Sequence, residues 1–306
     1  MKKKVKKQSR AKAVILIVLA SFIFIFIVIP ILLSFSNGSK FGNVALIPVE
    51  GIITGNGAST LGQQTLSSKT IVEFVEAASN SKQVKIIVLE INSPGGSAVA
   101  SDEIAAAVKK TNKPVIAYIR EVGASGGYWI ASASDHIVAN RMSITGSIGV
   151  ISSYLEFSGL MQDYGVGYQR LVAGDKKDIG TPFRKLQQEE EKLLQGKINK
   201  IHDYFIDAIA ENRGMSKVQV RSLATGEFYL GVEAKQNGLI DQLGNLDTVE
   251  EYIKQEYDLP SVDFIKYQRE VGFFELLGGV LSDFFFQIGQ GFASAFVKQS
   301  PNIMLT

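Results

Sequence analysis

The chain of 306 residues contains no cysteine and only two histidines, His136 and His202. The absence of cysteine excludes disulfide bonds, thiol catalysis and cysteine-ligated zinc or iron–sulfur sites. Two imidazoles also leave few ways to build a histidine metal site or a histidine general base. We therefore expect the chemistry of this protein to depend on other side chains.

Acidic residues are missing from the first twelve positions, which carry seven of the 32 Lys and Arg residues. The rest of the chain then has 25 basic residues against 30 acidic ones. A mildly acidic globular part repels phosphate, so the overall pI of about 8.5 does not indicate nucleic-acid binding. We exclude nucleic acid as a partner.

One long run, residues 13–33, has no charge at all. A helix of that length spans a hydrocarbon core of about 30 Å, and no A-x-A cleavage site follows, which favours an uncleaved anchor over a signal peptide. The basic tail, residues 1–12, predicts a cytoplasmic N-terminus. After a linker over residues 34–43, we expect an extracytoplasmic catalytic domain at the cell membrane, over residues 44–266.

Strand and helix patterns alternate within this domain. Alternation of this kind predicts an α/β fold with a mainly parallel sheet. Apolar runs predict strands at 44–51, 84–91, 114–120, 136–139 and 148–153. Helical spacing predicts helices at 69–79, 97–110, 126–134 and 188–213, and Ser216 with Gln219 predicts the start of another.

The C-terminal segment, residues 267–306, is again apolar and rich in phenylalanine. Glu275 and Asp283 lie within it, and an acid near the bilayer midplane costs about 2.5–3.5 kcal/mol on insertion scales. We therefore predict an interfacial helix or a subunit contact here rather than a second span.

Ser125 is a candidate nucleophile because it lies in a G-x-S-x-G pattern, Gly123 to Gly127, between a predicted strand and a predicted helix. The Gly126 amide would then face an oxyanion, whereas the alternative is that these small residues only pack a helix closely on the sheet. Neither histidine is placed as a downstream base, because His136 starts a strand and His202 lies beside the apolar stripe of a helix. The remaining base is a lysine, whose pKa would need to fall from about 10.4 towards 7.

Residues 171–184 supply two such lysines, Lys176 and Lys177, in a glycine-flanked loop. If the loop is extended, Lys176 and Asp178 point away from the side that Lys177 faces, which spares Lys177 a neighbouring carboxylate. Two further turns, residues 92–96 and 145–149, offer glycine amides and the Ser147 hydroxyl, although each would also be unremarkable as a plain turn.

Five segments together carry a family resemblance. They are INSPGG (91–96), EVGASGGYWIA (121–131), TGSIGV (145–150), GDKKDIGTPFR (174–184) and GEFYLGVEAKQNGLIDQLG (226–244). From about Val44 to Val262 the chain resembles the short, membrane-anchored signal peptide peptidases of the SppA family, in the ClpP/crotonase superfamily.

The resemblance implies a serine endopeptidase with a Ser/Lys dyad and no cofactor or metal. By the matching motifs, Ser125 is the nucleophile, Lys177 the general base, Ser147 the residue that orients the lysine, and Gly96 and Gly126 the oxyanion hole. The implied substrates are remnant signal peptides and other membrane-associated peptides, and the implied assembly is a ring-like homo-oligomer, an octamer, in contact with membrane lipid.

Three alternatives remain open at this point. One is a stomatin-directed membrane protease of the same superfamily, and another is an acyl-CoA hydratase on the same fold, which would not need Ser125. The third is a membrane scaffold that has lost catalysis, against which the complete set of Ser125, Ser147 and Lys177 speaks.

Overall fold

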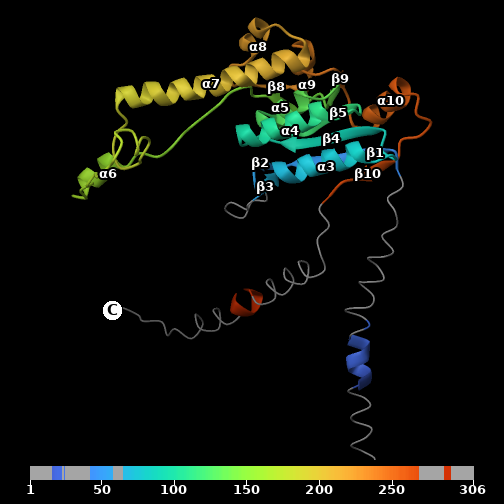
Figure 1. The fold of residues 1–306 in the computed structure, drawn as a ribbon, viewed down its shortest axis with the longest axis horizontal. Coiled ribbons are helices and arrows are strands. Elements are labelled where there is room, and N and C mark those ends of the chain that lie inside the picture. Colours follow the sequence, from blue (N-terminus) through green and yellow to red (C-terminus); the bar gives the residue numbers. More distant parts are fainter. Residues whose placement is uncertain (1–15, 23, 25–41, 58–64, 269–285, 291–306) are drawn as a thin grey trace, which may run out of the picture. The chain divides into compact units, whose positions relative to one another are not determined.

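The structure is a computed structural model, and the chain divides into two compact units (Figure 1). One unit comprises Phe41–Tyr267, and the other comprises residues 1–40 with 268–306. The structure describes residues 16–22, 24, 42–57, 65–268 and 286–290. Within them, none of the helices has the length and apolar character needed to cross a bilayer. Most of the predicted anchor and most of the predicted C-terminal segment lie outside the described residues.

A mainly parallel sheet forms the centre of the Phe41–Tyr267 unit, as the alternating pattern predicted. Its strands run in the order β10-β1-β4-β5-β6-β9, with β7 beside β5 and an antiparallel β8 beside β7, while β2 and β3 form a separate parallel pair. The strands are β1 (Val44–Glu50), β2 (Ile52–Thr54), β3 (Thr65–Ser67), β4 (Ile86–Ser93), β5 (Val115–Ala124), β6 (His136–Ala139), β7 (Ile144–Gly146), β8 (Phe228–Leu230), β9 (Gln242–Leu243) and β10 (Phe264–Lys266).

Helices cover both faces of the sheet. Within the described part of this unit they are α3 (Ser68–Asn80), α4 (Ala98–Lys110), α5 (Gly126–Ser132), α6 (Ser158–Asp163), α7 (Gln188–Arg213), α8 (Lys217–Leu223), α9 (Gly231–Gln236) and α10 (Leu246–Glu256). Successive residues of β4 point to opposite faces: Leu89 packs in the cluster that includes α3, α4, α5 and α7, and Val88 packs against α10. This two-sided burial explains why the central strands read as continuous apolar runs.

The ends of the long helix α7 follow from local sequence. Its predicted range, 188–213, is confirmed, and Gly214 ends it in the left-handed conformation at φ 62°. The capping box predicted at the start of the next helix, α8, is also confirmed, because the amide of Gln219 donates to Ser216 Oγ and the amide of Ser216 donates to Gln219 Oε1. At about 1.5 Å per residue, α7 is about 39 Å long.

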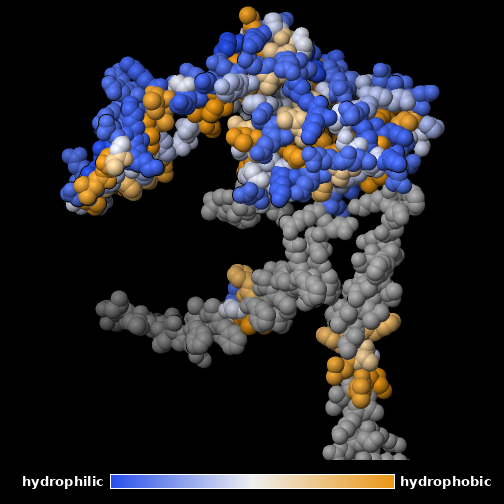
Figure 2. Space-filling model, in the orientation of Figure 1, coloured by the Kyte–Doolittle hydropathy of each residue, from blue (hydrophilic) through white to orange (hydrophobic). Residues whose placement is uncertain are grey.

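The segment between Ser147 and α7, residues 150–187, is called the arm below. The predicted strand at 148–153 is wrong. Among the described residues no strand pairing continues beyond Gly146, and Ser147 turns the chain at a φ of 49°. Helix α6 in the arm buries no residue, and Figure 1 draws it away from the sheet, beyond the loops that lead to the N-terminal end of α7. Large apolar side chains lie exposed along the arm, including Ile151 and Leu171 at more than nine-tenths exposure. In Figure 2 this part of the molecule shows hydrophobic residues among hydrophilic ones.

Candidate active site

Ser125 lies at the sharp junction between β5 and α5. Its backbone has a φ of 53° and a ψ of −122°, a combination that is costly for a residue with a side chain. The turn is held on both sides, because the Ser125 amide donates to the carbonyl of Gly146 at 2.8 Å and its carbonyl accepts from Trp129 at 2.9 Å. Among the described residues, no hydrogen bond engages Ser125 Oγ. This geometry presents a free hydroxyl on a fixed turn, as a nucleophile requires.

The helix that follows Ser125 is anchored deep in the core. Tyr128 is fully buried and donates its hydroxyl to the carbonyl of Leu239 at 2.8 Å. Burial raises the pKa of Tyr128 well above its usual range, so the phenol stays a neutral donor. Trp129 stacks on Phe205 of α7, with ring centroids 4.6 Å apart. These contacts fix the position of α5 and therefore of the serine at its start.

The loop after β4 lies against the same turn. The Ile53 amide donates to the Gly95 carbonyl at 2.9 Å, and the Ser97 amide donates to the Ile53 carbonyl at 2.8 Å. Gly96 lies between these two bonds, so its own N–H faces away from β2. A Cβ on Gly96 would overlap the Ile53 carbonyl oxygen, and this close approach of two backbones requires glycine.

The amides of Gly96 and Gly126 lie side by side next to Ser125. An added Cβ on Gly126 would be 3.4 Å from the Gly96 amide nitrogen, and it would overlap Ser101 Oγ. Within the described residues neither N–H is donated to an acceptor. Two neighbouring N–H groups that donate to no acceptor, beside a serine hydroxyl, can bind the oxyanion of a tetrahedral intermediate.

Ser147 is adjacent to Ser125 because β7 pairs with β5, with Ala124 opposite Gly146. Its amide donates to Glu227 at 2.9 Å, and its Oγ donates weakly to the Gly226 carbonyl at 3.4 Å. The structure thus places Ser147 where its hydroxyl could reach a group that approaches Ser125.

A cavity of about 530 Å³ joins these residues. Gly96, Ser125, Gly126 and Ser147 all line it. The rest of its wall is largely apolar and includes Trp129, Val150, Ile151, Ile198, Ile201 and Phe205. The site can therefore take an apolar side chain next to a nucleophile, although the sequence analysis did not anticipate that α7 supplies part of the wall.

Lys177 is not part of this wall. It lies exposed in the arm, beside a network that ties Asp178 through Arg184 to Glu190 at the first turn of α7. Glu190 precedes Ile198, the first residue of α7 that lines the cavity, by about 12 Å of helix. A single chain therefore brings Ser125, Ser147, Gly96 and Gly126 together and leaves Lys177 apart.

The extended conformation expected around Lys177 is wrong. The amide of Lys177 donates to Gly174 at 2.9 Å and that of Thr181 donates to Asp178 at 3.0 Å, so residues 174–180 form successive turns. Alternation of side chains therefore does not separate Asp178 from Lys177. Two arginines, Arg170 and Arg184, bind the Asp178 carboxylate instead. Sequence reasoning missed these arginines because their partners are set by the folding of the arm.

Neither histidine contacts Ser125. His136 begins β6, stacks on Tyr252 with centroids 3.8 Å apart and makes a 3.3 Å contact with Gln242. His202 is half-buried on α7, with its Nε2 3.2 Å from the carbonyl oxygen of Ile148. Both are engaged in structural contacts, and neither is placed as a base for Ser125, as expected from their positions in the sequence.

Comparison with known families and proteins gives a consistent result. Residues 107–260 match the model of peptidase family S49. A protein of Enterococcus faecium that bears the name of signal peptide peptidase SppA is 34% identical over 241 residues, which cover 78% of this chain and 70% of that protein. Protease 4 of Haemophilus influenzae is 33% identical over 72% of this chain, but the match covers only 36% of its own length.

A solved structure shares the fold. It is a variant of a membrane-bound stomatin-specific protease, with a TM-score of 0.50 and 15% identity over 76% of this chain and all of that chain. At this level of identity the likeness concerns the fold alone.

Proposed function

This chain belongs to peptidase family S49 and is an SppA-like serine protease, and we propose that it is a membrane-anchored endopeptidase that cleaves remnant signal peptides and other membrane-associated peptides. The observation that carries the proposal is the geometry at Ser125: a strained turn, a free hydroxyl and two neighbouring amides, from Gly96 and Gly126, in one largely apolar cavity. Such a site, on a fold of the ClpP/crotonase type, fits acyl transfer from a peptide to serine.

The mechanism uses only groups of the protein. Ser125 Oγ attacks the scissile carbonyl while the neutral amine of Lys177 takes its proton, and the amides of Gly96 and Gly126 bind the oxyanion. The lysine then delivers that proton to the leaving amine, and water hydrolyses the acyl-enzyme by the same route. No step requires a metal or a cofactor.

We propose that Lys177 reaches Ser125 from a neighbouring chain of a ring-like homo-oligomer, an octamer by family resemblance. Two observations support this arrangement. Lys177 does not line the cavity of its own chain, and the arm exposes apolar side chains that a single chain leaves uncovered. Head-to-tail contacts in a ring would repeat the same completed site in every subunit.

The proposed substrates and location rest on further features. The apolar wall, with Trp129, Ile198 and Phe205, suits apolar segments such as those of signal peptides. We propose that residues 13–33 anchor the chain as a single-pass helix with a cytoplasmic N-terminus and an extracytoplasmic catalytic domain, residues 44–266. The C-terminal segment, residues 267–306, would lie at the lipid surface or in a subunit contact.

The substrate class is tested by incubating the full chain, in vesicles, with peptides of matched length. One peptide carries an apolar signal-peptide core, one a polar core, and one an apolar segment of a stomatin. We expect cleavage within the apolar cores and little cleavage of the polar peptide. Cleavage of the stomatin segment alone would replace the proposed substrate class, and absence of any cleavage would favour an inactive scaffold.

Replacing Ser147 by alanine should lower the rate without eliminating it. The change removes a hydroxyl that we expect to orient the lysine amine, and it leaves nucleophile and base in place. We expect kcat to fall by about 10-fold to 100-fold, measured on the apolar peptide. Ser222→Ala is a suitable control, because Ser222 lies on α8 and is exposed. A Ser147→Ala enzyme with full activity would remove Ser147 from the site.

The pH dependence should show no contribution from histidine. A lysine base works only when neutral, so the rate should climb as pH rises, with no plateau near pH 6.5 of the kind that a histidine base produces. His136→Gln and His202→Gln should leave the pH–rate profile unchanged, since both rings make structural contacts. A profile that moves with either substitution would restore a histidine base.

A further inference from the structure

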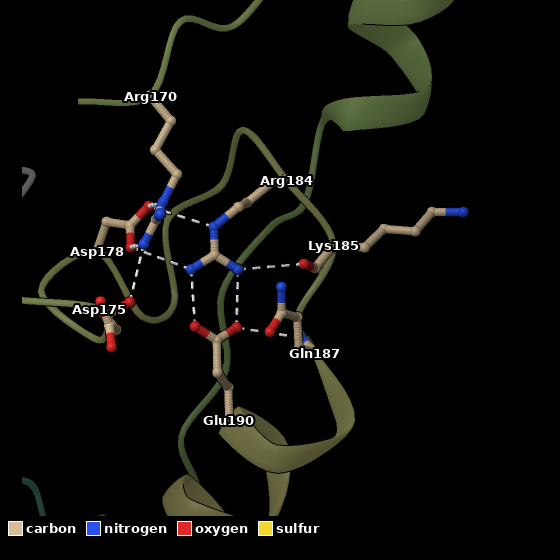
Figure 3. Close-up of polar contacts among 7 residues, drawn as sticks. All are labelled: Arg170, Asp175, Asp178, Arg184, Lys185, Gln187 and Glu190. Atoms are coloured by element: carbon tan, nitrogen blue, oxygen red, sulfur yellow. Dashed lines mark hydrogen bonds and ion pairs between the residues drawn. The ribbon is translucent and has the colours of Figure 1, made fainter. Parts of the chain in front are cut away.

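A four-membered ion network lies directly beside the lysine loop (Figure 3). Arg184 bridges two carboxylates: it donates to Glu190 at 2.7 and 2.8 Å and to Asp178 at 3.1 and 3.2 Å. Arg170 also donates two hydrogen bonds to Asp178, at 2.7 and 2.8 Å, and its Nη2 donates to the carbonyl of Asp175 as well. Both oxygens of Asp178 therefore accept from both guanidinium groups.

Three of the four side chains of this network are largely buried, whereas Arg170 is 37% exposed. The side chains of Glu190, Asp178 and Arg184 are 6%, 13% and 19% exposed. The Arg184 guanidinium and the Gln187 amide lower the pKa of Glu190 to about 2, and the two arginines hold the pKa of Asp178 well below its usual range. Because these carboxylate pKa values are lowered, the network is intact above about pH 4.5 and weakens as the pH falls towards 2. The carboxylates are therefore charged at every pH at which a lysine can act as a base.

The network connects the lysine loop to a rigid element. Asp178 is the residue immediately after Lys177, and the turns at Gly174 and Thr181 leave the loop little freedom. Glu190 belongs to the first turn of α7 and also accepts the Gln187 amide at 3.1 Å. By binding both Asp178 and Glu190, the Arg184 guanidinium therefore connects the loop of Lys177 to the N-terminal end of α7. In addition, a carboxylate that four guanidinium bonds occupy is not available to bind the Lys177 ammonium.

We propose that Arg184 is a positioning residue for the Lys177 base, acting through Asp178 and Glu190 to set where the amine lies. The inference rests on the proposed function of Lys177 and adds a residue to it. Bidentate contact with two carboxylates at once requires the planar fork of arginine, which a lysine does not reproduce.

The first test is a double-mutant cycle in the full chain. Arg184→Gln should lower kcat on the apolar peptide by about 10-fold to 100-fold with KM nearly unchanged, because a displaced base slows chemistry rather than binding. Arg184→Lys should restore only part of this loss. On a Lys177→Ala background, Arg184→Gln should leave the slow fluorophosphonate labelling of Ser125 unchanged, since the residue acts only through the lysine.

The matched control is Arg221→Gln, which breaks the exposed Arg221–Asp203 pair between α8 and α7 and should leave kcat unchanged. Light scattering and thermal unfolding are recorded for every variant. A purely structural role for Arg184 predicts loss of assembly, or slower Ser125 labelling on the Lys177→Ala background as well. Either of these results, or an unchanged kcat in Arg184→Gln, would overturn the proposal.

Mixed oligomers give a second, independent arm of the test. Arg184→Gln should suppress activity when placed in the Ser125→Ala chain, which donates only the lysine, and should be silent in the Lys177→Ala chain, which donates only the serine. Equal suppression in both chains would overturn the proposal. If mixed oligomers are inactive even without Arg184→Gln, the inter-subunit part of the proposed function fails, and the double-mutant cycle alone decides the role of Arg184.

Discussion

Ser125→Ala should abolish peptide cleavage, with a loss of about 10⁴-fold or more in kcat, because no other hydroxyl lies on the strained turn beside the Gly96 and Gly126 amides. Lys177→Ala should cost about 10²-fold to 10⁴-fold, the usual contribution of a general base. Lys176→Ala should retain most of the activity. Cleavage of the apolar peptide by each purified variant is the measurement, with unchanged oligomer size and thermal unfolding as controls.

The two lysines make this comparison decisive. Lys176 and Lys177 are adjacent, exposed and alike in chemistry, so a general effect of charge would alter both variants equally. If Lys176→Ala is inactive and Lys177→Ala is active, the assignment is wrong by one residue. If both retain full activity, the base is not in this loop.

Mixing two inactive chains should recover activity. In an oligomer assembled at random from equal amounts of Ser125→Ala and Lys177→Ala chains, a complete site needs its serine from one type and its lysine from the next chain of the other type. Roughly a quarter of the sites should then be whole, whereas each variant alone has none. The measurement is cleavage after coexpression, with purification through two different tags to select mixed oligomers.

The contrary outcome is equally clear. Mixed oligomers of correct size that show no more activity than the single variants would place Ser125 and Lys177 of one site in the same chain. The Lys177 loop would then have to move towards its own cavity, because about 12 Å of α7 separates Glu190 from Ile198, the first residue of that helix to line the cavity.

The sequence predicted best what local pattern and burial determine. The mainly parallel sheet follows from βα alternation, α7 covers the predicted range 188–213, and Gly214 ends it as expected for a left-handed cap. Ser125 was also recognisable, since a G-x-S-x-G pattern between a strand and a helix produces this kind of turn. These features depend on a few neighbouring residues each.

The arm could not be predicted in the same way. The apolar residues after Ser147 resemble a strand, but none of the strands in the described part of the chain pairs with them. The loop of Lys177 is shaped by Arg170 and Arg184 rather than by its own alternation. Such ion pairs depend on how the arm folds, and no short sequence motif predicts them. The apolar side chains of the arm lie exposed in a single chain. If a neighbouring chain covers them, as proposed above, the sequence of one chain gives no pattern from which that contact could be predicted.

The most direct test of the account is to map the adduct of a fluorophosphonate on the full chain by mass spectrometry. We predict a single modified peptide, with the label on Ser125, fast labelling in the wild-type chain and in Lys176→Ala, and slow labelling in Lys177→Ala. A label on Ser147 or on another serine, or labelling that is undiminished in Ser125→Ala, would contradict the assignment of Ser125 as the nucleophile.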